Sequence, residues 1–107
     1  MRDMAARPFG VMLIPSEFQV EDRLWDAATA ALEQDGLDRG EPQRSLVAAL
    51  DAAGIPCLDL LPQLLDTAPL ADGDRHLYRP CDTHFSVRGN QLAAEALAPF
   101  VRTLIQR

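Results

Sequence analysis

The amino-acid sequence predicts a mixed α/β domain with two to three parallel strands and about three helices. Short apolar runs at residues 9–14 and 55–60 indicate buried strands, and apolar residues at helical spacing lie between and after them. At 107 residues the chain is close to the usual size of one domain and too short for two separate cores. We therefore expect a single domain over residues 1–107.

The first strand, at residues 9–14, is stopped by Pro15. Ser16 follows, with Gln19 three residues later, which is the spacing of a capping box at a helix N-terminus. A helix is therefore expected from Ser16 to the natural stop at Gly36. Its apolar stripe comprises Leu24, Ala27, Ala28, Ala31 and Leu32.

A second helix is expected between Pro42, which suits a first helical turn, and Gly54, which suits a helix end. Its apolar stripe comprises Leu46, Val47, Leu50 and Ala53. The second strand, residues 55–60, has Pro56 near its start, which favours a strand beginning or an edge position. Because a strand, a helical excursion and a second strand form a crossover unit, the two strands are expected to be parallel, with their carboxyl ends at one edge.

The rest of the chain reads as a short helical turn at 62–66, a loop at 67–75 and a long helix beginning at Ser86. Pro99 lies inside that helix and is expected to bend or restart it near Ala98, because proline removes one helical hydrogen bond. Leu77 and Tyr78 form a candidate third extended piece.

Composition excludes several classes of function. Ten arginines, no lysine and sixteen acidic residues give a net charge of −6, which opposes the phosphate attraction behind most nucleic-acid binding. No apolar run is long enough to span a membrane, and the charged start at Met1 is not followed by the apolar run of a secretory signal, so localisation stays open. Cys57 and Cys81 match neither a Cys-x-x-Cys pair nor a disulfide framework, and they leave the redox compartment undetermined.

The residues best suited to catalysis are Asp82, Thr83 and His84, which directly precede the final predicted helix. An acid two residues from a histidine can orient the imidazole as a general base, so we expect His84 as base and Asp82 as its orienter. Tyr78 and Phe85 flank the pair and are candidate walls of a sugar or acyl pocket. Trp25 is a further candidate, although helix packing is its more common role.

A nucleophile for this pair is hard to find. Ser16 is better explained as a helix cap, and it remains a candidate because it lies at a strand's carboxyl end within possible reach of His84. Cys81 is disfavoured as a nucleophile, since the adjacent Asp82 raises rather than lowers a thiol pKa.

A metal site is an open alternative. Its ligands would come from Asp72, Asp74, His76, Cys81, Asp82 and His84, although their spacing matches no standard zinc or calcium loop.

The run Leu-Tyr-Arg-Pro-Cys-Asp-Thr-His-Phe-Ser-Val-Arg-Gly-Asn at residues 77–90, with the Ala/Leu-rich stretch after it, resembles the last block of the SGNH (GDSL-type) hydrolases. Residues 13–20 and 54–62 resemble strand ends of the branch related to alginate O-acetylation proteins. The two-residue step from Asp82 to His84 also matches that branch better than the three-residue step of common lipolytic members. The resemblance covers most of residues 9–101.

The resemblance implies a flavodoxin-like three-layer α/β/α fold with a serine esterase or O-acetyl transfer site, acting on an acyl or acetyl ester without a cofactor or metal. The family's Gly-Asp-Ser nucleophile motif and its oxyanion glycine and asparagine blocks do not occur here, and the sole asparagine, Asn90, falls within the helix. We therefore expect the C-terminal half of such a domain, inactive alone, with any export signal or anchor preceding Met1. The alternative is a non-catalytic module that forms homo-oligomers through exposed sheet edges.

Overall fold

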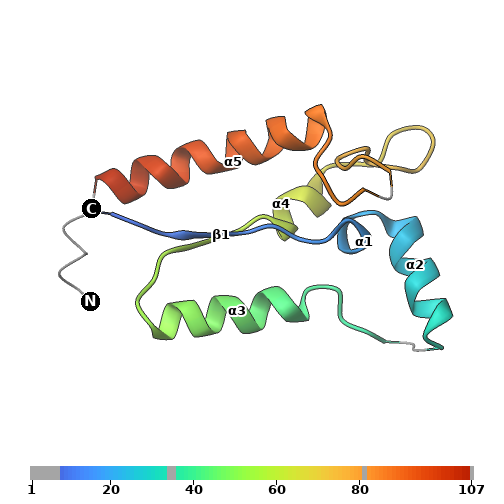
Figure 1. Ribbon diagram of the computed structural model, residues 1–107, viewed down its shortest axis with the longest axis horizontal. Helices are drawn as coiled ribbons and strands as arrows, with labels where there is room; N and C mark the ends of the chain where they lie inside the picture. The colour runs from blue at the N-terminus through green and yellow to red at the C-terminus, as the bar shows by residue number, and fades with distance from the viewer. Residues whose placement is uncertain (1–7, 34–35, 81, 107) are drawn as a thin grey trace.

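The computed structural model describes residues 8–33, 36–80 and 82–106, and within them it contains five helices and one two-stranded sheet (Figure 1). The elements, in chain order, are β1 (Val11–Leu13), α1 (Glu17–Val20), α2 (Asp22–Ala31), α3 (Glu41–Ala52), β2 (Cys57–Asp59), α4 (Leu61–Asp66) and α5 (Val87–Ile105). The mixed α/β class is therefore confirmed, with more helices than expected. No helix in the described ranges combines the length and apolar character that a membrane crossing requires.

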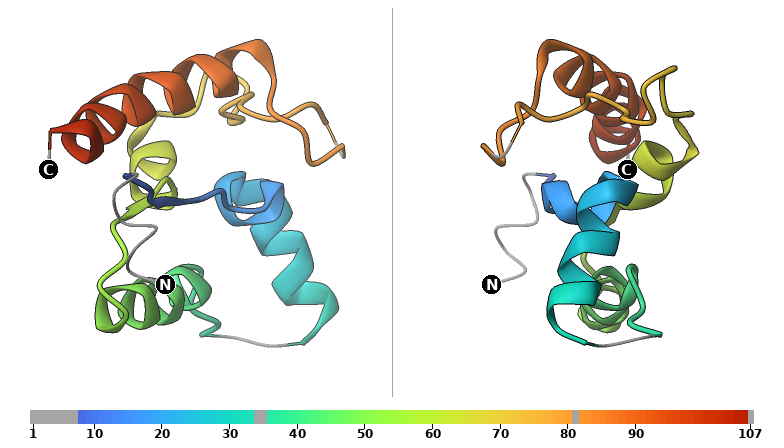
Figure 2. Two further views of the ribbon diagram at one scale, coloured as in Figure 1. Left: turned by 60° about the vertical axis from the view of Figure 1, so that its left-hand side comes forward. Right: turned by 90° about the vertical axis from the view of Figure 1, so that its right-hand side faces the viewer.

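The sheet consists of β1 and β2, which pair in parallel with Val11 opposite Cys57 and Leu13 opposite Asp59. The prediction of two parallel strands is thus confirmed, and the carboxyl ends of both strands lie at the same end of the sheet. Figures 1 and 2 show α5 on one side of the sheet and α3 on the other. The sheet is therefore enclosed between helices.

The single helix predicted from Ser16 to Gly36 is wrong, because the chain breaks at Glu21 into α1 and α2. Glu21 adopts an extended conformation, with φ −90° and ψ 114°. Its carboxylate Oε2 accepts a hydrogen bond of 2.9 Å from the main-chain N–H of Arg75, 54 residues along the chain. The break therefore depends on a distant partner that no local periodicity reveals.

Arg75, a residue only 7% exposed, holds this junction together through its side chain. Its guanidinium donates hydrogen bonds to the carbonyls of Val20, Leu65 and Thr67 at 2.6, 3.2 and 2.7 Å. It also lies 3.3 Å from the Asp22 carboxylate. A buried charge is tolerated here because it is both paired and hydrogen-bonded.

The apolar stripe predicted for the first helix does not form core. In α2 no residue is buried, and Ala27, Ala31 and Leu32 are exposed. Leu24 and Ala28 are half-buried. Two residues of the stripe, Ala28 and Leu32, instead line a surface pocket, described below.

The other helices follow the sequence more closely. In α3, Pro42 lies in the first turn and Gly54 follows the end with φ +73°, although Leu46 of the predicted stripe is 50% exposed. The turn predicted at 62–66 is α4. Of the bend or restart predicted near Ala98, the restart is wrong, since α5 runs unbroken through Pro99, and the bend stays a prediction. Pro99 and Glu95 are both exposed, so water can satisfy the Glu95 carbonyl that the proline leaves without a partner.

The core lies where α1, α4 and α5 meet the segment around Leu77. Its buried apolar residues are Val20, Leu60, Leu61, Leu64, Leu77, Tyr78 and Ala93. The proposed third extended piece at Leu77–Tyr78 does not join the parallel sheet; Tyr78 instead forms an isolated antiparallel bridge with Phe85. This bridge forms the base of the loop that carries Asp82 and His84.

Candidate active site

The segments 77–80 and 82–86 run back alongside each other and present Asp82 and His84 at the tip. Besides the Tyr78–Phe85 bridge, the Ser86 N–H donates to the Leu77 carbonyl at 2.9 Å, and the Arg79 N–H donates to the His84 carbonyl at 2.8 Å. The rings of Tyr78 and Phe85 pack with centroids 4.9 Å apart. The stem of the loop is therefore fixed by main-chain bonds and by aromatic packing.

Thr83 makes the turn at the tip. Its φ of +64° is in the left-handed region, which is costly for a β-branched residue. The Asp82 N–H donates to the Arg79 carbonyl at 3.1 Å and stabilises the turn. The turn brings together two side chains that are only two positions apart, and His84 Nδ1 lies 2.9 Å from Asp82 Oδ1.

The neighbours of His84 fix which ring nitrogen carries the proton. Nδ1 lies 2.9 Å from the Asp82 carboxylate and 3.1 Å from the Asp82 carbonyl, and both of these oxygens are acceptors. Nδ1 must therefore donate its proton, so neutral His84 has an unprotonated Nε2. Among the described residues no group hydrogen-bonds to Nε2, so it is able to accept a proton from a substrate or nucleophile.

Charge and exposure are consistent with a general base. The hydrogen bond to Asp82 raises the pKa of His84 above its usual value, and the charge of Asp82 acts in the same direction. The side chains are 77% exposed for His84 and 44% for Asp82. The imidazole is accessible, but nothing in the described part of the chain shields it from water as a closed active site does.

Tyr78 joins this loop to the carboxyl end of β1. Its hydroxyl donates a hydrogen bond of 2.5 Å to the Pro15 carbonyl, and the side chain is 4% exposed. Burial, followed by the nearby Glu17 and Glu21 charges, raises its pKa strongly, so the phenol stays protonated and keeps donating. The structure gives Tyr78 and Phe85 a packing role, and their proposed contact with substrate stays a prediction.

Ser86 and Ser45 form hydrogen bonds through their hydroxyls, whereas the bond of Ser16 is made by its main-chain N–H. The Ser86 hydroxyl donates to the His76 carbonyl at 2.6 Å and accepts from the Gly89 N–H at 3.1 Å, so it caps α5 as predicted. Ser45 donates to Glu41 on the surface of α3. Ser16 precedes α1, and its N–H donates to Gln19 Oε1 at 3.0 Å, in line with the predicted capping box.

The nucleophile role considered for Ser16 stays untested. Within the described ranges, the ring hydrogen bonds of His84 go to Asp82 and none goes to Ser16. Cys81 lies outside the described residues. For Cys57, burial and then the charges of Asp59 and Asp51 raise the thiol pKa, which keeps the sulfur in its less reactive form.

The metal hypothesis is only partly supported by the geometry. Among the described residues, Asp72, Asp74 and His76 have potential ligand atoms within 4.8 Å of one another, whereas Asp82 and His84 pair separately. His76 Nε2 lies 2.6 Å from Asp72, and the hydrogen bond between them raises the His76 pKa. Protonated His76 can therefore balance this cluster without an ion.

No known protein family, curated protein or solved structure matches this chain.

Proposed function

We propose that Asp82 and His84 are the orienter and general base of an SGNH-type serine esterase or O-acetyl transferase site. The observation that carries the proposal is the His84 Nδ1–Asp82 Oδ1 hydrogen bond of 2.9 Å, with Nε2 accessible. In this arrangement the acid fixes the tautomer and stabilises the imidazolium that forms when Nε2 takes a proton. The substrate class is an acyl or acetyl ester.

The layout of the chain supports the same proposal. The pair directly precedes the N-terminus of α5, and Tyr78 ties its loop to the residue before Ser16, at the carboxyl end of β1. In parallel α/β sheets, ligands bind beyond the carboxyl ends of the strands. Helices on both sides of the parallel pair agree with a partial flavodoxin-like three-layer fold.

The nucleophile is the missing part. No Gly-Asp-Ser sequence occurs in the 107 residues, and the hydroxyls of Ser45 and Ser86 already donate to Glu41 and to the His76 carbonyl. We therefore propose that the serine activated by His84 belongs to a segment that these residues do not contain. Ester hydrolysis by the 107 residues alone is then expected to be close to the uncatalysed rate.

The test is to read the gene on both sides of the 107 codons and to express the longer product. An in-frame Gly-Asp-Ser-like segment is expected. The longer product should hydrolyse p-nitrophenyl acetate, and His84→Ala should abolish this activity. His76→Ala is the control, because it removes the other histidine that is paired with an aspartate, and it should change the activity little.

Two results would contradict the proposal. The absence of any such segment in frame would remove the nucleophile on which it depends. Hydrolysis by the 107 residues alone, lost in both Ser16→Ala and His84→Ala, would instead identify Ser16 as the nucleophile.

A second candidate function, self-association, is favoured by the open sheet. In the described part of the chain β1 pairs only with β2, so each strand has an unpaired outer edge, and Phe9 and Ile14 beside β1 are 59% and 55% exposed. Unpaired edges and apolar side chains promote pairing between chains. Sedimentation across a concentration series tests this, and a folded monomer at every concentration would rule it out.

A further inference from the structure

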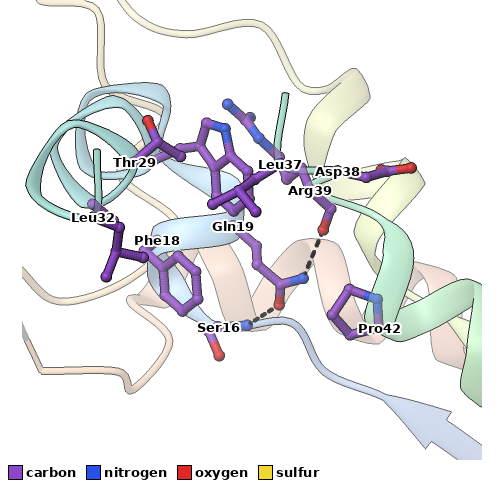
Figure 3. A pocket seen from close by; sticks show the side chains of 11 residues that line it. Ser16, Phe18, Gln19, Thr29, Leu32, Leu37, Asp38, Arg39 and Pro42 are labelled. Carbon is purple, nitrogen blue, oxygen red and sulfur yellow. Dashed lines mark hydrogen bonds between the residues drawn. The ribbon is translucent and has the colours of Figure 1, made fainter. Parts of the chain in front are cut away.

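A pocket of about 340 Å³ opens between α1, α2 and the segment leading into α3 (Figure 3). Its walls come from Phe18 on α1, from Trp25, Ala28 and Leu32 on and just after α2, and from Leu37 and Pro42. The volume falls within the range of about 300–1,000 Å³ typical of small-molecule sites. Of the stripe predicted for the first helix, only Ala28 and Leu32 line this pocket, and Trp25 had been a candidate pocket wall.

The walls are apolar and aromatic. The rings of Phe18 and Trp25 are parallel within 1°, with centroids 6.0 Å apart. Phe18, Leu32 and Leu37 are 44%, 64% and 41% exposed, so three large apolar side chains border a concave surface and remain in contact with water. A ligand that covers them gains hydrophobic free energy at about 25 cal/mol per Å² of apolar area buried.

The floor of the pocket is held in place by a buried amide pair. Gln19, 5% exposed, donates through Nε2 to the Arg39 carbonyl at 2.9 Å and to Gln43 Oε1 at 2.8 Å. Gln43 donates back to Gln19 Oε1 at 3.2 Å, and the Ser16 N–H donates to the same oxygen. Figure 3 shows Gln19 linking Ser16 to the segment that carries Arg39. The pocket is therefore preorganised by bonds between α1 and α3.

The charged groups at the rim already have partners. Arg39 Nη1 lies 2.7 Å from the Asp22 carboxylate, and its guanidinium carbon lies 5.3 Å from the Trp25 ring centroid. Asp38 is paired with Arg44. A charged ligand would have to displace these pairs, and an anion would also meet the chain's net charge of −6. The chemistry therefore favours an uncharged ligand.

From this geometry we propose that the pocket is a binding site for an uncharged small molecule that carries an aromatic ring. The ring extends the Phe18–Trp25 stack and covers Leu32 and Leu37. This inference goes beyond the esterase proposal and does not depend on it, because neither Asp82 nor His84 lines the pocket.

The test uses Trp25, the only tryptophan in the chain, as its reporter. Benzyl alcohol is titrated into the purified 107-residue chain while Trp25 emission is recorded, and benzoate serves as the charged probe with the same ring. Ala28→Leu fills the pocket, whereas Ala27→Leu places the same side chain one position away, at an exposed residue outside the lining. Both substitutions suit a helix, so the two variants form a matched pair.

We expect saturable binding of benzyl alcohol, about tenfold or more weaker in Ala28→Leu and unchanged in Ala27→Leu. Benzoate should bind much more weakly than benzyl alcohol. A response that never saturates, an equal response in Ala28→Leu, or equal affinity for benzoate would overturn the proposal. The proposal would also be overturned if the chain self-associated with rising concentration and Ala28→Leu abolished that association, because a second copy of the chain would then occupy the pocket.

Discussion

Gly89 allows α5 to approach the loop that carries Asp82 and His84, and Gly89→Ala is expected to destabilise the fold. A Cβ at this position would lie 1.9 Å from the Leu77 carbonyl oxygen and 2.8 Å from the Phe85 ring. The contact with a main-chain oxygen cannot be relieved by rotating a side chain. The start of α5 must therefore move away by more than about 1 Å to restore an ordinary contact.

The expected cost combines opposing effects. Alanine is favoured over glycine in a helix by about 1 kcal/mol. Against this, overpacking costs about 1–3 kcal/mol, and displacing α5 weakens the Ser86 N–H bond to the same Leu77 carbonyl, worth about 1 kcal/mol. It also opens the contact between Ala93 and the buried Leu77 region. We expect a net loss of about 2 kcal/mol in the free energy of unfolding.

Urea unfolding followed by circular dichroism measures this difference. Asn90→Ala is the control, because Asn90 is the next residue of the same helix and is exposed. That change should stabilise the chain by a few tenths of a kcal/mol at most through helix propensity alone. If Gly89→Ala is as stable as the parent chain, the close approach of α5 to Leu77 is incorrect.

Three further predictions concern the loop and its attachment. By proton NMR, the raised pKa of His84 should fall toward about 6.5 in Asp82→Asn. The Asp82–His84 pair should accordingly stabilise the fold fully below about pH 6.5, and this stabilisation should be lost as the pH rises through the raised pKa of His84. An unchanged His84 titration in Asp82→Asn would disprove the ion pair. Tyr78→Phe leaves the carbonyl after β1 without its donor, and urea unfolding should show a loss of about 1–3 kcal/mol; no loss would mean that the bond is absent. Arg75→Met leaves three main-chain carbonyls unpaired and should lower the free energy of unfolding by about 3 kcal/mol or more. The control, Arg102→Met on the exposed surface of α5, should lower it by about 0.5 kcal/mol or less. Similar losses in the two variants would refute the role of Arg75.

The elements that the sequence predicts well are those set by neighbouring residues. The parallel pair β1–β2 follows from two apolar runs joined by a helical excursion, and the start of α5 follows from the hydroxyl of Ser86. The Asp82–His84 pair follows from a two-residue spacing, although the left-handed Thr83 between them was not foreseen. A β-branched residue gives no local signal for that conformation.

The features that escaped prediction depend on contacts between distant residues. The break at Glu21 is fixed by Arg75, and the pocket floor is fixed by the Gln19–Gln43 pair, 24 residues apart. Helical periodicity describes one element at a time, so the apolar stripe predicted for the first helix does not reveal that no residue of α2 is buried. The exposure of the α2 side chains depends on where α2 lies relative to the other helices, which its own sequence does not specify.

The hydrogen bond from Tyr78 to Pro15 also bears on how the chain folds. It joins residues 63 positions apart, and the Arg75 side chain reaches Val20 across 55 positions. Contacts of this separation become favourable only after a long loop has closed, so they slow folding relative to a bundle of local contacts. A nascent chain can form α3 while it is being synthesised, but the loop that carries His84 can dock against β1 only after most of the sequence has been made.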